Sequence, residues 1–275
     1  SFVRGHLAHA DADIAIDVIA TSDHETGGKV KYFRSKDLYS DHDAAHVSVL
    51  PVGGVTYISG QADKGDLREA TRGTLKQLEA TIKYLGIAKE QVVQIKSFVQ
   101  PMSDISIVEK EFAEFFKGGT VPPLVFVDWL SQNPVIEIEL IAASPAAAMK
   151  NPEQLSFLTP PGMITSPVYS KVSQINHGKK IYVSALYGST LNDPKAQTAE
   201  IFASLKELLT LAGSDFKRLA KATYYVSDDK ASVSLNEIRP KFYDPGRPPA
   251  ASKALVRGLG IPGMNINIDM IGVVK

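Results

Sequence analysis

The sequence predicts an α+β protein built from two tandem copies of one small β-β-α-β-α-β domain. The main observation is an internal repeat: VIEIELIA at 135–142 returns 130 positions later as NINIDMIG at 265–272. Upstream of each, TYISG at 56–60 corresponds to IYVSA at 181–185. Both copies also show strand-type alternation and helix-type periodicity in the same order, so the duplication covers whole domains.

The first copy opens with two short strands and a helix. Residues 46–50 and 55–59 alternate like strands around the glycine-containing turn 51–54, which predicts a hairpin. Residues 66–85 form an amphipathic helix, and Gly86 supplies its left-handed stop. The apolar face of this helix consists of Leu67, Leu75, Leu78, Ile82 and Leu85.

The rest of the first copy repeats this alternation of strand and helix. Residues 91–99 alternate as a strand. Asp104 or Ser103 caps a second amphipathic helix that ends at Gly118-Gly119. A strand at 134–142 closes the unit.

The second copy follows the same order. Its second helix, over 232–243, is expected to be short or kinked because Pro240 falls within it. Its other elements are strands near 169–175 and 180–184 around the turn 176–179, a helix over 195–212 stopped by Gly213, and a strand over 219–227.

The strand pattern found at 135–142 and 265–272 occurs a third time near the N-terminus. IAIDVIA at 14–20 has the same alternation, which indicates either the tail of a further copy or a strand kept to cover a sheet edge. We therefore expect an N-terminal strand extension over 1–33, a first domain over 34–147 and a second domain over 152–275.

Each sheet has helices on one face only, so its other face must pack against another layer. The residues assigned to that face are too apolar for water, which predicts sheets packed on sheets, within the chain or between chains. These residues include Val47, Tyr57, Phe98 and Phe126.

Composition excludes several functional classes. The chain has 30 lysines plus arginines and 30 aspartates plus glutamates. Its net charge is therefore zero and does not attract nucleic acid or an anionic membrane. No cysteine is present, which rules out a thiolate nucleophile and leaves the compartment undecided. No apolar stretch approaches the length of a spanning helix.

The ordered motifs resemble the RidA/YjgF family, also labelled endoribonuclease L-PSP. In the first copy the resemblance runs from YISGQ at 57–61 through EFAEFF at 111–116 to IEIELIA at 136–142. In the second copy it rests on PVYS at 167–170, YVS at 182–184 and RPPAAS at 247–252.

The resemblance implies a chorismate-mutase-like fold, a trimeric barrel of three domains and small-molecule clefts between neighbouring domains. Known members hydrolyse 2-imino and enamine acids to 2-keto acids without metal or organic cofactor, and others carry ribonuclease labels. The implied partners are a small carboxylic acid and further copies of the chain, not nucleic acid or membrane.

The arginine that grips the substrate carboxylate in this family is missing. Ala251 stands in its place in the second copy, and the run Pro122-Pro123-Leu124-Val125 has no cation in the first. Loss of a bidentate charge-assisted contact weakens carboxylate binding by roughly 10- to 100-fold. Lys253 lies two residues beyond Ala251 on the same strand face, and we weigh it as a substitute cation against a solvated lysine.

Other family positions are retained in one copy or the other. Glu137 matches the water-positioning glutamate, whereas Asn267 replaces it in the second copy. Glu137 and Ser59 are the expected catalytic residues, although backbone hydrogen bonding suits Ser59 better than a nucleophilic role. The expected ligand-binding residues are Gly60, Gln61, Tyr169, Ser184, Asn236, Arg247 and Lys253.

No metal site is expected. His42 and His46, with Asp41 and Asp43, would have ligand spacing only on a helix, and His46 begins a strand. Three functions remain: a site that binds or hydrolyses 2-keto, imino or enamine acids, a non-catalytic scaffold or regulatory binder, and an endoribonuclease, which the charge balance disfavours.

Overall fold

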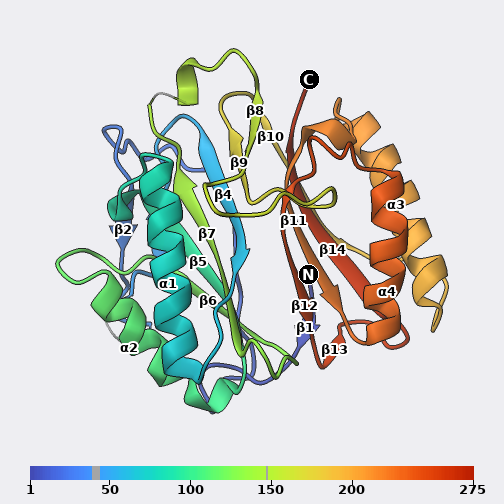
Figure 1. Cartoon of the computed structure of the whole chain (residues 1–275), viewed down its shortest axis with the longest axis horizontal. Coiled ribbons are helices and arrows are strands. Elements are labelled where there is room, and N and C mark those ends of the chain that lie inside the picture. Colours follow the sequence, from blue (N-terminus) through green and yellow to red (C-terminus); the bar gives the residue numbers. More distant parts are fainter. Residues whose placement is uncertain (39–43, 147) are drawn as a thin grey trace. The chain divides into compact units, whose positions relative to one another are not determined.

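The computed structural model describes residues 1–38, 44–146 and 148–275, which divide into two compact units (Figure 1). The N-terminal unit contains residues 6–56 and 60–149. The C-terminal unit contains residues 150–275 together with Ser1–Gly5 and Tyr57–Ser59.

The sheet of the N-terminal unit has the order β6-β5-β7-β4. β5 pairs antiparallel with β7 and parallel with β6. A separate two-stranded sheet joins β2 to β3. The strands are β2 (Lys31–Phe33), β3 (Val47–Val49), β4 (Val55–Gln61), β5 (Val92–Val99), β6 (Leu124–Asp128) and β7 (Ile136–Ala143).

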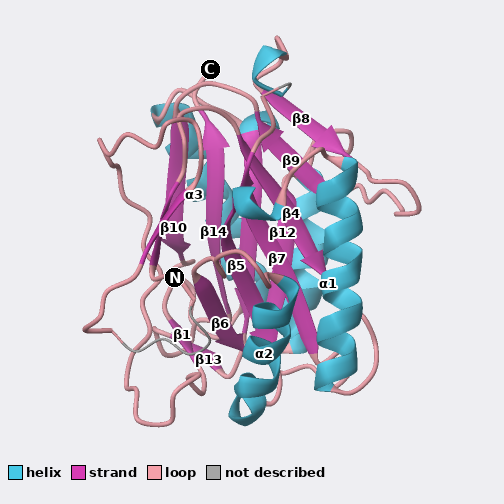
Figure 2. Cartoon of the chain, turned by 90° about the vertical axis from the view of Figure 1, so that its left-hand side faces the viewer, coloured by secondary structure: helices cyan, strands magenta, loops and turns pink. Residues whose placement is uncertain are grey.

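Two helices, α1 (Leu67–Tyr84) and α2 (Ile105–Phe115), lie along one face of this sheet (Figure 2). α1 begins with a capping box in which the Asp66 carboxylate accepts from the Glu69 N–H and the Glu69 carboxylate from the Asp66 N–H. Asp104 precedes α2 without making a side-chain cap bond. The predicted apolar residues Leu67, Leu75, Leu78 and Ile82 of α1 are buried, as are Ile105, Val108 and Phe112 of α2.

The C-terminal unit has a four-stranded sheet of order β10-β14-β11-β12 and two antiparallel pairs, β8 with β9 and β1 with β13. Its strands are β1 (Val3–Arg4), β8 (Leu155–Leu158), β9 (Val172–Ile175), β10 (Lys180–Leu186), β11 (Leu219–Val226), β12 (Ala250–Leu255), β13 (Gly258–Leu259) and β14 (Ile266–Val273).

The helices α3 (Pro194–Leu211) and α4 (Asp229–Ile238) cover one face of this sheet (Figure 1). Pro240 ends α4, and a 3₁₀ turn follows, as the proline predicts. The core beneath the helices centres on Phe202, Leu205, Tyr224 and Leu235. Further 3₁₀ turns lie at Lys89–Gln91, Met102–Asp104, Ala148–Lys150, Phe216–Arg218 and Arg239–Lys241.

The predicted hairpins are wrong, although the strands and turns that suggested them are present. β3 pairs with β2, and β9 pairs with β8, while β10 pairs with β14. Alternation and a glycine turn identify strands and a reversal of the chain. They do not determine which strand edge supplies the hydrogen bonds, because several edges present the same backbone groups.

Each unit also contains a strand after its second helix that the predicted order lacks. β6 and β12 follow the second helix and pair parallel with β5 and β11. β6 has only five residues and no alternation of exposed and buried positions, so its sequence signal is weak. Phe126 on β6 stacks on Phe112 of α2 and therefore faces the helices, not the opposite side of the sheet as predicted.

The strand predicted at 14–20 is not formed. These residues take no helix or strand conformation, and Ile14, Ile16 and Val18 are each more than two-thirds exposed. Alternation alone cannot stabilise a strand without a neighbouring one. The segment is held instead by Asp17, which accepts from Gln94 Nε2 at 2.8 Å and pairs with Lys96 at 3.2 Å.

Candidate functional site

A hydrogen-bonded junction at Ser170 joins three segments of the C-terminal unit. The Ser170 N–H donates to Pro249 O at 3.0 Å, and its Oγ donates to Pro248 O at 2.6 Å. Its carbonyl accepts from Ser59 Oγ at 2.5 Å, and Ser59 Oγ accepts from the Ala251 N–H at 2.7 Å. We call Ser59, Ser170, Pro248, Pro249 and Ala251 the Ser170 junction.

Ser59 holds this junction together. Its side chain is 1% exposed, and its hydroxyl donates one bond and accepts another, both with backbone groups. A serine nucleophile needs a base that removes its proton, whereas this proton is directed at a carbonyl. The geometry therefore favours a structural role for Ser59.

Tyr169 and Lys171 flank the central serine of the junction. The Lys171 ammonium donates to Tyr169 Oη at 2.7 Å and lies 4.5 Å from the centre of the tyrosine ring. The Lys171 carbonyl accepts from the Ser59 N–H at 3.0 Å. Both side chains are half-buried, so a cation is fixed beside the junction. The sequence-based site did not include Lys171, although its spacing of two from Tyr169 places both on one face of an extended segment.

Arg247 precedes the two prolines of the junction. Its guanidinium carbon lies 5.2 Å from the ring centre of Phe157 on β8, and its backbone N–H donates to Asp244 O at 2.9 Å. The side chain is half-buried. Arg247 is thus a second cation near the junction.

Ala251 and Lys253 share one face of β12, as alternation predicts, and this face is the one covered by helices. Ala251 packs into the core cluster, so an arginine at this position would put a charge among apolar side chains. Lys253 Nζ donates to Ser232 Oγ on α4 at 2.6 Å. The structure therefore places the Lys253 ammonium, considered above as a substitute cation, against α4.

Asn236 lies on the exposed side of α4, where its Oδ1 accepts from Arg239 Nη2 at 3.0 Å. Arg239 is buried, 5.4 Å from the centre of the Tyr224 ring. The Tyr224 and Tyr243 hydroxyls are hydrogen-bonded at 2.5 Å. Burial raises the pKa of both tyrosines, so this group is neutral apart from the arginine.

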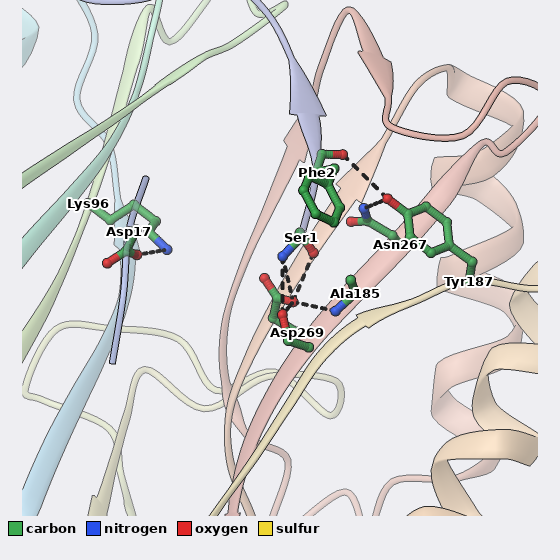
Figure 3. A network of polar contacts seen from close by, with 9 residues as sticks. Ser1, Phe2, Asp17, Lys96, Ala185, Tyr187, Asn267 and Asp269 are labelled. Atoms are coloured by element: carbon green, nitrogen blue, oxygen red, sulfur yellow. Dashed lines mark hydrogen bonds and ion pairs between the residues drawn. The ribbon is translucent and has the colours of Figure 1, made fainter. Parts of the chain in front are cut away.

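Ser184 of β10 belongs to a different polar group, which centres on Asp269 (Figure 3 shows Asp269 with Ser1 and Ala185). Its Oγ donates to Asp269 Oδ1 at 3.0 Å, and the Ala185 N–H donates to the same oxygen at 2.8 Å. Asp269 also accepts from Ser1 Oγ at 2.8 Å. The Ser1 ammonium lies 3.4 Å from the same oxygen, so four donors of its own unit occupy the acid.

Asn267, which replaces the family glutamate, lies two residues before Asp269 on β14 (Figure 3). Its Nδ2 donates to Tyr187 Oη at 2.9 Å, and Tyr187 Oη in turn donates to Phe2 O at 3.4 Å. An amide has no carboxylate to act as a base, so this group cannot supply general base catalysis through residue 267.

In the N-terminal unit, Glu137 lies against the backbone of Gly60. A Cβ at position 60 would come within 2.0 Å of Glu137 Oε1, so only glycine leaves room for the carboxylate. Gln61 is buried and donates to Thr81 of α1 at 3.0 Å. Gly60 and Glu137 therefore lie together, while Gln61 faces the helix.

Metal-binding chemistry has no support in the described residues. Within 1–38, 44–146 and 148–275, no group of three or more His, Asp or Glu side chains is placed to hold a metal ion. His46 Nδ1 accepts from the Ser35 N–H at 3.0 Å, and Asp41, His42 and Asp43 lie outside the described residues. Across the same ranges, no helix combines the length and apolarity needed to cross a bilayer.

A depression of about 570 Å³ lies on the C-terminal unit, and no residue of the Ser170 junction lines it. It is lined by Asp215, Phe216, Lys217, Phe242, Tyr243 and Asp244. Asp244 pairs with Lys217, and Asp215 pairs with Arg218 and Lys275. Since its charges are already paired and none of the predicted site residues lines it, we do not assign it to the site.

Comparison with known proteins agrees with the duplicated fold. The Endoribonuclease L-PSP family profile matches residues 40–144 and again 164–274. The chain belongs to this family. Its two matched segments make it a tandem RidA/YjgF protein.

Curated relatives of this L-PSP family chain cover one copy of the repeat. A RutC family protein of Pyrococcus horikoshii is 30% identical over 86 residues, which are 30% of this chain and 68% of the relative. Protein DfrA of Myxococcus xanthus is 28% identical over 113 residues, which are 38% of this chain and 84% of DfrA. A Rid-family structure from Yersinia pestis shares 22% identity with a TM-score of 0.41, covering 44% of this L-PSP chain and 100% of that one.

Proposed function

We propose that the C-terminal unit binds a small carboxylic acid of the 2-keto or 2-imino type beside the Ser170 junction. The ligand carboxylate is held by the Lys171 ammonium, which supplies the positive charge that Ala251 does not. Two points support this assignment. The family acts on substrates of this class, and Lys171 lies beside the RPPAAS motif, in which Ala251 stands in place of the expected arginine.

The observation that carries the proposal is the environment of Lys171. Among the described residues, no carboxylate lies within ion-pair distance of its ammonium. One of its three N–H donors is directed at Tyr169 Oη, which leaves two for a ligand. Holding a half-buried ammonium without an acid is unfavourable unless an anion joins it.

We propose binding without hydrolysis in this unit. Asn267 replaces the glutamate that positions water in the family, and Ser59 is committed to backbone bonds. Ammonia release from freshly generated 2-aminoacrylate tests this point. Release that is lost in a Glu137→Gln variant would instead assign hydrolysis to the chain.

The ribonuclease label of the family is disfavoured as a function here. The 30 basic and 30 acidic side chains give no net charge with which to attract a phosphate backbone. We expect no cleavage of RNA by preparations that are free of contaminating nuclease. Cleavage that disappears with Glu137→Gln would contradict this expectation.

The binding proposal is tested by calorimetric titration of the full chain with 2-ketobutyrate. We expect Lys171→Met to weaken binding by roughly 10- to 100-fold, the value of one charge-assisted contact. Lys171→Arg keeps the charge and should retain most of the affinity. Lys179→Met, at an exposed lysine in the same unit, is the matched control. Equal affinity of Lys171→Met and the unchanged chain would refute the proposal.

A further inference from the structure

The chain places a second cation within reach of the same junction. Lys171 directly follows Ser170, and Arg247 directly precedes Pro248, while Ser170 Oγ donates to Pro248 O at 2.6 Å. With steps of 3.8 Å between successive Cα atoms, the Cα atoms of Lys171 and Arg247 are no more than about 15 Å apart. Two long cationic side chains at this spacing can contact one small ligand.

Arg247 is held by contacts that leave its hydrogen-bonding capacity available. Its guanidinium lies over the Phe157 ring, and a contact with a ring face uses no N–H donor. Phe157 is paired on β8 with Ser173 of β9, two residues after Lys171. The ring therefore fixes the arginine near β9, the strand that directly follows Lys171.

Asp244, three residues before Arg247, has other partners for its carboxylate. Asp244 Oδ2 pairs with Lys217 at 3.7 Å, and its Oδ1 accepts from the Gly246 N–H at 3.0 Å. Among the described residues, no carboxylate lies within ion-pair distance of Arg247. Lys171 and Arg247 thus bring two positive charges to one region without an acidic partner for either.

We infer that the ligand of this site is a small dicarboxylic acid, with one carboxylate on Lys171 and the second on Arg247. The inference rests on the proposed binding function and adds the substrate class. The two cations repel each other, and a doubly charged ligand offers one opposite charge to each of them, whereas a singly charged ligand offers only one. The planar guanidinium fork matches a carboxylate with two parallel hydrogen bonds.

The test compares 2-ketoglutarate with 2-ketobutyrate by calorimetric titration of the full chain at fixed ionic strength. We expect the dicarboxylate to bind at least about 10-fold more tightly, as one added charge-assisted contact predicts. Arg247→Gln should remove the preference, so that 2-ketoglutarate and 2-ketobutyrate bind with similar affinity. Lys171→Met should weaken both ligands.

Two further variants separate charge from folding. Arg247→Lys keeps a cation but loses the fork, and it should retain part of the preference for the dicarboxylate. Arg257→Gln removes an exposed arginine of the same unit and should change nothing. Circular dichroism of each variant verifies that it is folded.

The outcomes distinguish this inference from the proposal on which it rests. Equal affinity of the two acids for the unchanged chain, or an unaltered preference in Arg247→Gln, overturns the dicarboxylate inference alone. Failure of both acids to bind overturns the binding function and the inference together.

Discussion

Single residues in this chain have roles that their identity alone does not reveal. Ser59 and Ser184 occupy equivalent positions in the two repeats, yet Ser59 is buried in backbone bonds whereas Ser184 is exposed and donates to Asp269. The hydroxyl is the same, and its hydrogen-bond partners decide what it does. A residue that matches a family position therefore indicates a role only when its burial and hydrogen-bond partners are known.

Glu200 gives a pH-dependent prediction at this scale. Its carboxylate accepts from Thr190 Oγ1 at 2.5 Å and from the backbone N–H groups of Ser189 at 2.5 Å and Thr190 at 3.1 Å. These bonds, led by the Thr190 hydroxyl, lower the pKa of Glu200 to about 2. A lowered pKa stabilises the fold above the ordinary value of 4.5, and this contribution is lost as the pH falls toward 2.

We expect amide exchange at Ser189 and Thr190 to accelerate as the pH is lowered from 4.5 to 2, beyond the intrinsic pH effect. Glu200→Gln should remove this pH dependence because an amide does not titrate. Glu207→Gln, at an exposed position on the same helix, is the control. Equal pH profiles for Glu200→Gln and the unchanged chain would show that the carboxylate does not hold the loop.

At the scale of elements, the helices follow directly from the sequence. The predicted helices over 66–85 and 195–212 are observed as α1 and α3, and glycines with positive φ follow both. Helix signals are local, because caps, periodicity and stop residues lie within one segment. Strand pairing is not local, which explains why the two predicted hairpins are wrong and why β6 was missed.

The two N-caps of the N-terminal unit predict different mutational effects. Asp66→Ala removes a complete capping box and should lower the free energy of unfolding by about 1 kcal/mol. Asp104→Ala removes an N-cap residue whose side chain makes no cap bond, and it should have a much smaller effect. Urea unfolding of both variants measures the difference. Equal losses would contradict the assigned capping geometry.

At the scale of the whole molecule, the tandem architecture gives each unit its own sheet and helices. Apolar side chains remain exposed in the single chain, among them Ile14, Ile16, Val18, Val47 and Tyr182. Exposed apolar surface of this kind favours association. With no net charge, long-range repulsion does not oppose it.

We therefore predict that the chain self-associates through these exposed apolar side chains. Light scattering coupled to size exclusion should give a mass well above the 29.7 kDa of one chain at micromolar concentration. Ile16→Asp and Val47→Asp should shift the mass toward that of one chain, and Lys179→Asp, at an exposed polar position, should not. A mass of one chain at all concentrations would contradict the prediction.

The sequence by itself determined the duplication, the family and the helices. These features depend on residue identity and local periodicity, which the chain carries in linear order. Only the tertiary structure decided that the Ser59 hydroxyl bonds to backbone groups and that Lys253 faces α4. It also placed Lys171 and Tyr169 beside the RPPAAS motif at 247–252. The physical reason is that hydrogen bonds, burial and charge pairing join segments far apart in sequence, and no local pattern specifies those partners.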